Sequence, residues 1–265
     1  MSVKRQRTAS FRLVERLVDL FRQSRWRSPS RTCSKPKAAY GTIPIDSHED
    51  IPPRLHWAGP SPVFLLPPEM MTLQGAHRFT GQHPFVRAIA LGPEGLERFY
   101  AAFSPGGLAE MYQIPIRGLR GEALPPWKLP WLEGGGKPPG AEAGLGLEHG
   151  VSYFGPCSPQ KVAAEYHRLI SVASRIEREG YRPAPREHIA GHFLQMGKDF
   201  RFFVRGGKHR AAALVHLGYE RIPVRVRSDW PRVIAAGTER DWPLVRSGDV
   251  DQRLAVQILE RYFRN

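Results

Sequence analysis

Three basic side chains follow a pair of glycines in the C-terminal half of the chain. Gly206 and Gly207 precede Lys208, His209 and Arg210. A helix that begins here leaves backbone N–H groups unpaired and carries about half a positive charge at its first turn, so it attracts anions such as phosphate. Basic side chains at that end are unfavourable unless an anion is close. The pattern therefore indicates a phosphate site, or else a tight strand–helix turn with solvated charges.

The residues on either side predict the elements that position this turn. Phe200 to Arg205 alternate with a period of two, which predicts a strand. The alanine-rich stretch from Lys208 predicts a helix that Gly218 ends in the left-handed conformation. Residues 222–226, IPVRV, alternate again and predict a second strand. We expect the two strands to be parallel, because a helix connects them, and the fold to be mixed α/β.

A longer helix and a further strand are expected upstream. Ser158 is a good N-cap, and the apolar residues that follow recur at helical spacing to about Glu179. His188 and His192 have the spacing of two metal ligands on a helix. The prolines and glycine around them oppose a helix, and residues 189–196 fit a strand that enters a hairpin at Gly197. We therefore expect no metal site formed by the protein alone.

Two stretches carry a resemblance to a known superfamily. GGKHRAAALVHLGYERIPVRV resembles the second conserved box of the ParB/sulfiredoxin superfamily, which runs glycine, a variable residue, His or Arg, Arg, small residues, a Leu-Gly turn and an IPV strand. LISVASRIEREG, residues 169–180, is similar to the superfamily's "L..SI...G" helix, with Ile176 and Gly180 in the matching places. Residues 153–226 more closely resemble uncharacterised ParB-like proteins that are often grouped with surface-polysaccharide genes.

The resemblance implies a ParB/sulfiredoxin-like core and a nucleotide-phosphate site. Gly207, His209 and Arg210 match the phosphate-gripping positions, and Gly206 supplies the turn. The implied ligand is ATP or CTP with Mg²⁺. The superfamily includes free-serine kinases, so phosphoryl transfer is implied as well, with Lys208 suited to stabilising the phosphates by its charge.

Two differences between this sequence and the superfamily argue against two of the superfamily's known activities. Sulfiredoxins place their reactive cysteine where this chain has Lys208, which argues against sulfinic-acid reduction. The 38 residues after Arg227 are too few for both the DNA-binding and the dimerisation domain of chromosome-partitioning ParB proteins, which argues against sequence-specific centromere binding.

Four further residues are candidates for catalysis. In the related ParB-like proteins the region of Glu165 and the position of His149 lie on the nucleotide side, so His149, Glu165 and Arg168 become candidate catalytic residues. Glu165 and Glu177 are candidate carboxylates for Mg²⁺. The simpler alternative is that Glu165 and Arg168 form an i,i+3 pair on the surface of their helix.

Charge is distributed unevenly along the chain. It contains 39 Lys and Arg against 25 Asp and Glu, and residues 1–37 alone hold a net charge of +9 out of +14. The apolar residues of this segment recur at helical spacing, which predicts a basic amphipathic helix that binds an anionic membrane surface or nucleic acid, or that docks on its own domain.

The remaining segments suggest how the chain is organised. We expect a linker or extended wrap over 38–80, additions with a Gly/Pro-rich, lid-like loop over 81–146, the ParB/sulfiredoxin-like domain over 147–227 and a packing helix over 228–265.

An apolar content of 41% is sufficient for a core. No window approaches the roughly 20 apolar residues that span a bilayer. Cys33 and Cys157 form no CxxC motif and suggest a reducing compartment, so we expect a cytoplasmic protein, peripheral to the inner face of the membrane if the basic segment binds lipid.

Three functional hypotheses follow. The first is a nucleotide-binding protein that acts as a phosphotransferase or nucleotide hydrolase. The second is a nucleic-acid-binding protein or nuclease that uses the basic turn and residues 1–37. The third, a membrane-peripheral accessory protein of glycan assembly, rests on residues 1–37 and on the grouping of the related proteins.

Overall fold

The computed structural model describes residues 42–52, 55, 59, 62–115, 117–136, 144–151, 153–184 and 188–264. These residues belong to one compact unit. The basic segment 1–37, from which the membrane and nucleic-acid hypotheses come, lies outside the described residues, as does Cys33. Among the described residues no helix is both long and apolar enough to cross a membrane.

One mixed sheet organises the described part of the chain, which is mixed α/β as the sequence predicted. Its strand order is β1-β2-β7-β5-β6-β3-β4, and β8 also pairs with β5. The strands are β1 (Thr42–Pro44), β2 (Val63–Leu66), β3 (Met71–Leu73), β4 (His77–Arg78), β5 (Ile189–Met196), β6 (Asp199–Gly206), β7 (Ile222–Val226) and β8 (Val233–Ala235).

The β5–β6 hairpin lies at the centre of the sheet. Met196 pairs with Asp199, so Gly197 and Lys198 form a two-residue turn, in which Gly197 has φ 60°. β7 pairs parallel to the first half of β5, and β8 pairs parallel to its second half. The predicted strand over 189–196, the hairpin at Gly197 and the two strands around the glycine turn are therefore confirmed.

The predicted direction of the two strands around the turn is wrong. β5 lies between β6 and β7, antiparallel to β6 and parallel to β7, so β6 and β7 run in opposite directions. Ala190 of β5 pairs with Gly206, the last residue of β6, and also with Arg225, near the end of β7. Most of β7 therefore lies past the end of β6, and β7 runs back toward it. The connecting helix therefore does not have to return the chain along the length of β6, and the crossover rule for neighbouring parallel strands does not apply.

The segment expected as a linker or extended wrap contributes half of the strands. β1 and β2 extend the sheet beyond β7, and β3 and β4 extend it beyond β6. Phe64 and Leu66 of β2 are fully buried. β2 is a short apolar segment between prolines, and its sequence periodicity does not show that it pairs with β7.

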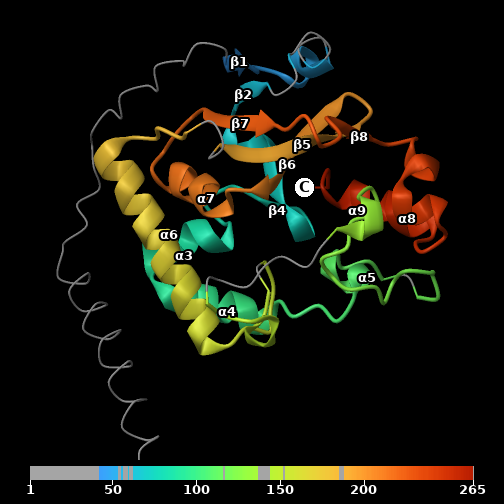
Figure 1. The fold of residues 1–265 in the computed structure, drawn as a ribbon, viewed down its shortest axis with the longest axis horizontal. Coiled ribbons are helices and arrows are strands. Elements are labelled where there is room, and N and C mark those ends of the chain that lie inside the picture. The colour runs from blue at the N-terminus through green and yellow to red at the C-terminus, as the bar shows by residue number, and fades with distance from the viewer. Residues whose placement is uncertain are drawn as a thin grey trace, which may run out of the picture. The chain divides into compact units, whose positions relative to one another are not determined.

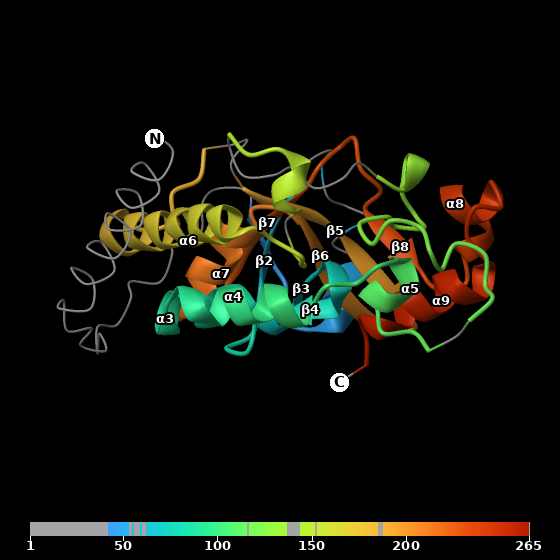
Figure 2. The same ribbon diagram turned by 90° about the horizontal axis from the view of Figure 1, so that it is seen from below.

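Helices cover both faces of the sheet, as Figures 1 and 2 show. On one side lie α3 (Pro84–Leu91), α4 (Pro93–Ala102), α6 (Pro159–Glu179) and α7 (Lys208–His216), and on the other lie α5 (Leu108–Met111), α8 (Pro243–Arg246) and α9 (Gln252–Arg261). Each side has its own hydrophobic cluster. Phe193 and Phe202 point into the first cluster, and Leu194 and Phe203 point into the second, as the pleat of the hairpin requires.

Short 3₁₀ helices complete the architecture. They span His48–Asp50, Pro68–Met70, Gln74–Ala76, Glu133–Gly135, Leu147–His149 and Glu239–Asp241.

The Gly/Pro-rich segment before α6 packs against the second cluster. Trp131 is 3% exposed and makes edge contacts with Phe203, Trp242 and Tyr262. Trp131 therefore packs on the face of the sheet that carries the second hydrophobic cluster. Trp127 is less buried and lines a cavity, so the two tryptophans of the segment have different environments.

α6 begins and ends where its sequence predicts. The Ser158 side chain accepts a hydrogen bond from the Lys161 backbone N–H, and the helix ends at Gly180, whose φ is 76°. Its buried residues include Val162, Leu169 and Ile176. This face packs against α7 and the shorter helices α3 and α4, which places one side of α6 beside the glycine turn.

Candidate functional site

The two glycines between β6 and α7 have different roles. Gly207 has φ 85° in the left-handed region, and a Cβ atom there would lie 3.1 Å from the Ile189 Cα atom. A Cβ atom on Gly206 would meet nothing within 4 Å. Only Gly207 is therefore required by the backbone conformation and by the close approach of β5.

The first two basic residues of α7 turn inward, onto a carboxylate of α6. Lys208 is 8% exposed, His209 is 6% exposed and Glu165 is fully buried. The Lys208 Nζ group donates a hydrogen bond to Glu165 Oε1, and His209 Nε2 lies 3.3 Å from the same oxygen. Glu165 is therefore an anion, supplied by the protein itself, at the end of α7 where the helix dipole favours one.

Aromatic side chains enclose this ion pair. The Tyr100 hydroxyl of α4 donates a hydrogen bond to Glu165 Oε2, so both carboxylate oxygens have partners. The Lys208 Nζ atom lies 4.7 Å from the ring centroids of Phe85 and Tyr153. The attraction between an ammonium group and the face of a ring adds to the ion pair. We call Tyr100, Glu165, Lys208 and His209 the buried carboxylate network.

The environment determines the protonation of these groups. Burial by itself would raise the pKa of Glu165, but Lys208 and then His209 more than offset burial, and the pKa lies well below its usual range. Burial, and next the charge of Glu165, raise the pKa of Tyr100 well above 10. The carboxylate is therefore ionised and the phenol protonated at neutral pH, in agreement with the direction of their hydrogen bond.

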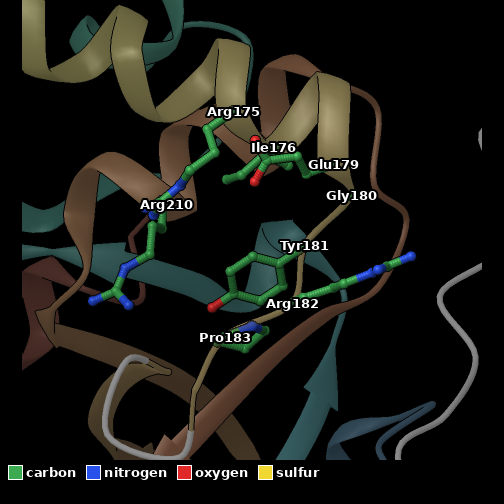
Figure 3. Close-up of a pocket in the computed structure, with 8 residues that line it drawn as sticks. All are labelled: Arg175, Ile176, Glu179, Gly180, Tyr181, Arg182, Pro183 and Arg210. Atoms are coloured by element: carbon green, nitrogen blue, oxygen red, sulfur yellow. The ribbon is translucent and has the colours of Figure 1, made fainter.

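Arg210 points away from this network, into a cavity of about 270 Å³. Figure 3 shows the Arg175 side chain extending from α6 toward Arg210, with the Tyr181 ring across the cavity and Arg182 extending away from it. Glu179 is the one carboxylate among the described residues that line this cavity. We call it the arginine cavity; it is defined by Arg175, Ile176, Glu179, Gly180, Tyr181, Arg182, Pro183 and Arg210.

The surroundings of the arginine cavity are also basic. The pKa of His188 is lowered first by burial and then by the charges of Arg225 and Arg210, so these two guanidinium groups lie near one imidazole. Among the side chains that the structure describes, none caps the N-terminus of α7. The outward face of the glycine turn therefore combines a helix N-terminus with several arginines, an environment that favours anions.

The other candidate residues lie apart from the arginine cavity. His149 Nδ1 lies 3.0 Å from the Ser158 hydroxyl at the start of α6. Arg168 and Glu177 are exposed, and neither lines the cavity. The alternative of a surface pair between Glu165 and Arg168 is wrong, because Glu165 points into the core.

Magnesium would have few protein ligands here. The described residues contain no group of three or more His, Cys, Asp or Glu side chains that could hold a metal ion. Both oxygens of Glu165 are already occupied, so it is poorly suited to bind Mg²⁺. Since Mg²⁺ is commonly held by one or two carboxylates together with ligand phosphates, Glu179 is the residue of the arginine cavity that would contact it.

The surroundings of Cys157 do not activate its thiol as a nucleophile. It is a free thiol, and burial together with Glu165 raises its pKa to about 11. The thiolate is the reactive form of cysteine, so this thiol is unreactive at neutral pH.

Sequence reasoning identified the turn but missed the residues that complete its surroundings. Tyr100 and Phe85 come from helices far away in the sequence, and nothing in their local pattern links them to Lys208. Arg175, Tyr181 and Arg182 flank Gly180, the end of the helix that carries the superfamily resemblance. Their position beside that motif is the one local signal that could have identified them.

The fold and the site define a mixed α/β protein with a buried carboxylate network on one side of a helix N-terminus and an arginine cavity on the other. Comparison of the chain with protein-family models, with curated proteins and with solved structures gave no significant match.

Proposed function

We propose that this protein binds a nucleotide of the ATP or CTP type through its phosphates, at the N-terminus of α7, in a ParB/sulfiredoxin-like core. The observation that carries the proposal is the arginine cavity, in which Arg175 extends toward Arg210 and Glu179 is the one carboxylate among the described lining residues. The resemblance of the GGKHR segment to a phosphate-binding box supports it independently.

The chemistry of the lining residues favours phosphate over other anions. A guanidinium group presents several N–H donors in a planar fork that matches two oxygens of one phosphate, and it stays charged at any physiological pH. Two such groups, those of Arg175 and Arg210, suit a ligand with more than one negative charge. A chain of phosphates would meet both Arg210 and the backbone N–H groups of the uncapped turn.

The buried carboxylate network has a positioning role in this proposal. By holding Lys208 and His209 inward, Glu165 fixes the first turn of α7 against α6, which carries Arg175. Arg175 and Arg210 are then set at a fixed separation across the cavity. Phosphate binding therefore depends on Gly207 and Arg210 directly, and on Lys208 and His209 through the position of the helix.

Phosphoryl transfer or nucleotide hydrolysis is the activity that we propose for the bound nucleotide. Mg²⁺ bound to the phosphates would neutralise charge that develops during transfer, and Glu179 would contact the ion. The arginines would orient the phosphates for attack.

The test is thermal unfolding of the whole chain with ATP, CTP, GTP or inorganic tripolyphosphate, each with Mg²⁺, for the wild type and for Arg210→Ala. A ligand at about 100 times its dissociation constant stabilises the folded state by about 2.7 kcal/mol. We expect a shift for tripolyphosphate and at least one nucleotide in the wild type, and none for Arg210→Ala. Arg246→Ala is the matched control, because Arg246 is exposed at the end of α8 and lines neither cavity.

The result that would overturn the proposal is the absence of a shift with all four ligands, or an equal shift in Arg210→Ala. Binding of single-stranded nucleic acid that persists with saturating nucleotide and weakens steeply with salt would instead support the nucleic-acid alternative. Arg205 and Arg227, whose guanidinium groups lie 4.0 and 4.7 Å from the Trp230 ring centroid, give that alternative a structural basis.

A further inference from the structure

A second cavity lies beside the end of β6, the strand that leads into the glycine turn. Its volume is about 140 Å³. Tyr153 connects it to the buried carboxylate network, because this residue lines the cavity and its ring also contacts Lys208 Nζ. Its lining combines the apolar side chains of Trp127, Leu129, Leu132 and Phe203 with the polar side chains of Gln74, Tyr153 and Arg205. Concave apolar sites with a few polar groups are typical of small-molecule binding.

Arg205 is the one charged residue among the described residues that line this cavity. It is half-buried at the end of β6, and its guanidinium group stacks on Trp230 at 4.0 Å. None of the ion pairs found among the described residues includes Arg205; the nearby Asp229 forms a bidentate pair with Arg227. Burial and then Arg227 lower the pKa of Arg205, and the charge of Asp229 offsets only a part of this.

Tyr153 is held in a backbone conformation that bulky residues rarely adopt. Its φ is 92°, in the left-handed region that favours glycine. Such strain persists where the surrounding structure requires it, and it is concentrated at functional sites. Here it places an aromatic ring between Lys208 and the second cavity.

We propose that the second cavity is a binding site for a small monocarboxylate with a flat or branched apolar body. The apolar body would pack among Trp127, Leu129 and Leu132, and the carboxylate would accept hydrogen bonds from Arg205. One guanidinium group matches one negative charge. A phosphate dianion in the same place would bring a second charge for which the described lining residues supply no second cation, and an unpaired charge in a cavity is costly. The site is separate from the arginine cavity and does not depend on nucleotide binding there.

The experiment is a titration of the full-length protein with benzoate and with its neutral analogue benzamide, followed by ligand-observed NMR. A charge-assisted hydrogen bond is stronger than a neutral one, so we expect benzoate to bind saturably and at least about tenfold more tightly than benzamide. Arg205→Gln should weaken benzoate binding by a similar factor. Arg246→Gln is the matched control, since Arg246 is exposed at the end of α8 and lines neither cavity.

Equal binding of benzoate and benzamide by the wild type, or no saturable binding of benzoate, would overturn the proposal without any variant. Benzoate binding that Arg205→Gln leaves unchanged would overturn it as well, with thermal unfolding used to show that the variant is folded. Arg210→Ala should bind benzoate as the wild type does, which separates this site from the proposed nucleotide site.

Discussion

Glu165 determines which of the three basic residues of the turn face the outside. It takes Lys208 and His209 into the core and leaves Arg210 to the arginine cavity. A buried ion pair contributes little net stability compared with apolar residues of similar volume, because both charges lose their hydration. Removing one partner is different, since it leaves the other charge buried without its counterion. The network is therefore sensitive to single substitutions and more tolerant of double ones.

We expect Glu165→Gln to lower the free energy of unfolding by about 3–5 kcal/mol, because Lys208 then stays buried without its carboxylate. Replacing both partners, in Glu165→Gln/Lys208→Met, should restore a large part of that loss. Urea unfolding of the wild type, both single variants and the double variant measures the coupling. Additive losses in the double variant would show that the two side chains do not act as a pair.

At the level of elements, the entry into α7 depends on a single glycine. Gly207 adopts the left-handed conformation beside Ile189, whereas the space around Gly206 is open. A sequence in which two glycines stand together does not show which of them is required.

Gly207→Ala should therefore destabilise the protein by more than about 1 kcal/mol, since it combines a left-handed alanine with a close contact to β5. Gly206→Ala is the matched control and should change stability by less than about 1 kcal/mol. Chemical denaturation of both variants measures the difference. Equal effects would mean that the turn can adopt another conformation.

Elements with strong local signals could be predicted from the sequence. The bounds of α6 follow from Ser158 and Gly180, and those of α7 from Gly207 and Gly218, because caps and glycines act locally. The pairing of strands could not be predicted in the same way. β2 and β3 join strands more than 120 residues away, and β5 separates β6 from β7, arrangements that no local pattern contains.

The candidate site shows the same limit. The sequence brought attention to Lys208, His209, Arg210 and Glu165, and the structure places Glu165 against the first two of them. The sequence does not show that Lys208 and His209 point inward and Arg210 outward, because these directions depend on how α6 packs on α7.

At the scale of the whole molecule, the pKa values of His77, His83 and His192 are lowered far below the usual value for histidine. Burial lowers the pKa of His77 to about 4 and that of His192 to about 3. Burial, and then the charges of His77 and Lys208, lower the pKa of His83 well below its usual value. Each imidazole is neutral in the folded state and takes up a proton more readily in the unfolded chain. Stability is therefore complete above about pH 6.5 and falls as the pH decreases from there.

We expect the free energy of unfolding to decrease by about 1.4 kcal/mol per pH unit for each of these histidines between pH 6 and pH 4.5. In His192→Leu the free energy of unfolding should decrease less steeply with falling pH, by the contribution of one histidine, about 1.4 kcal/mol per pH unit. The variant should keep near wild-type stability at pH 7.5, because neither ring nitrogen of His192 has a hydrogen-bond partner among the described residues.

Urea unfolding at several pH values measures both effects. The contribution of Glu165 is lost only below its unfolded-state pKa of about 4.5, so it does not obscure this range. A slope unchanged by His192→Leu would contradict the assignment of a neutral buried imidazole.

The strand order also has a consequence for synthesis on the ribosome. β2 is made early but pairs with β7, which the ribosome completes about 160 residues later, or roughly 8–30 s at ordinary rates of translation. During that interval β2 has only the three-residue β1 to pair with, and Phe64 and Leu66 lack the rest of the sheet. The nascent chain therefore exposes apolar strand residues until the central hairpin and β7 emerge, and exposed apolar surface of this kind makes a folding chain prone to aggregation.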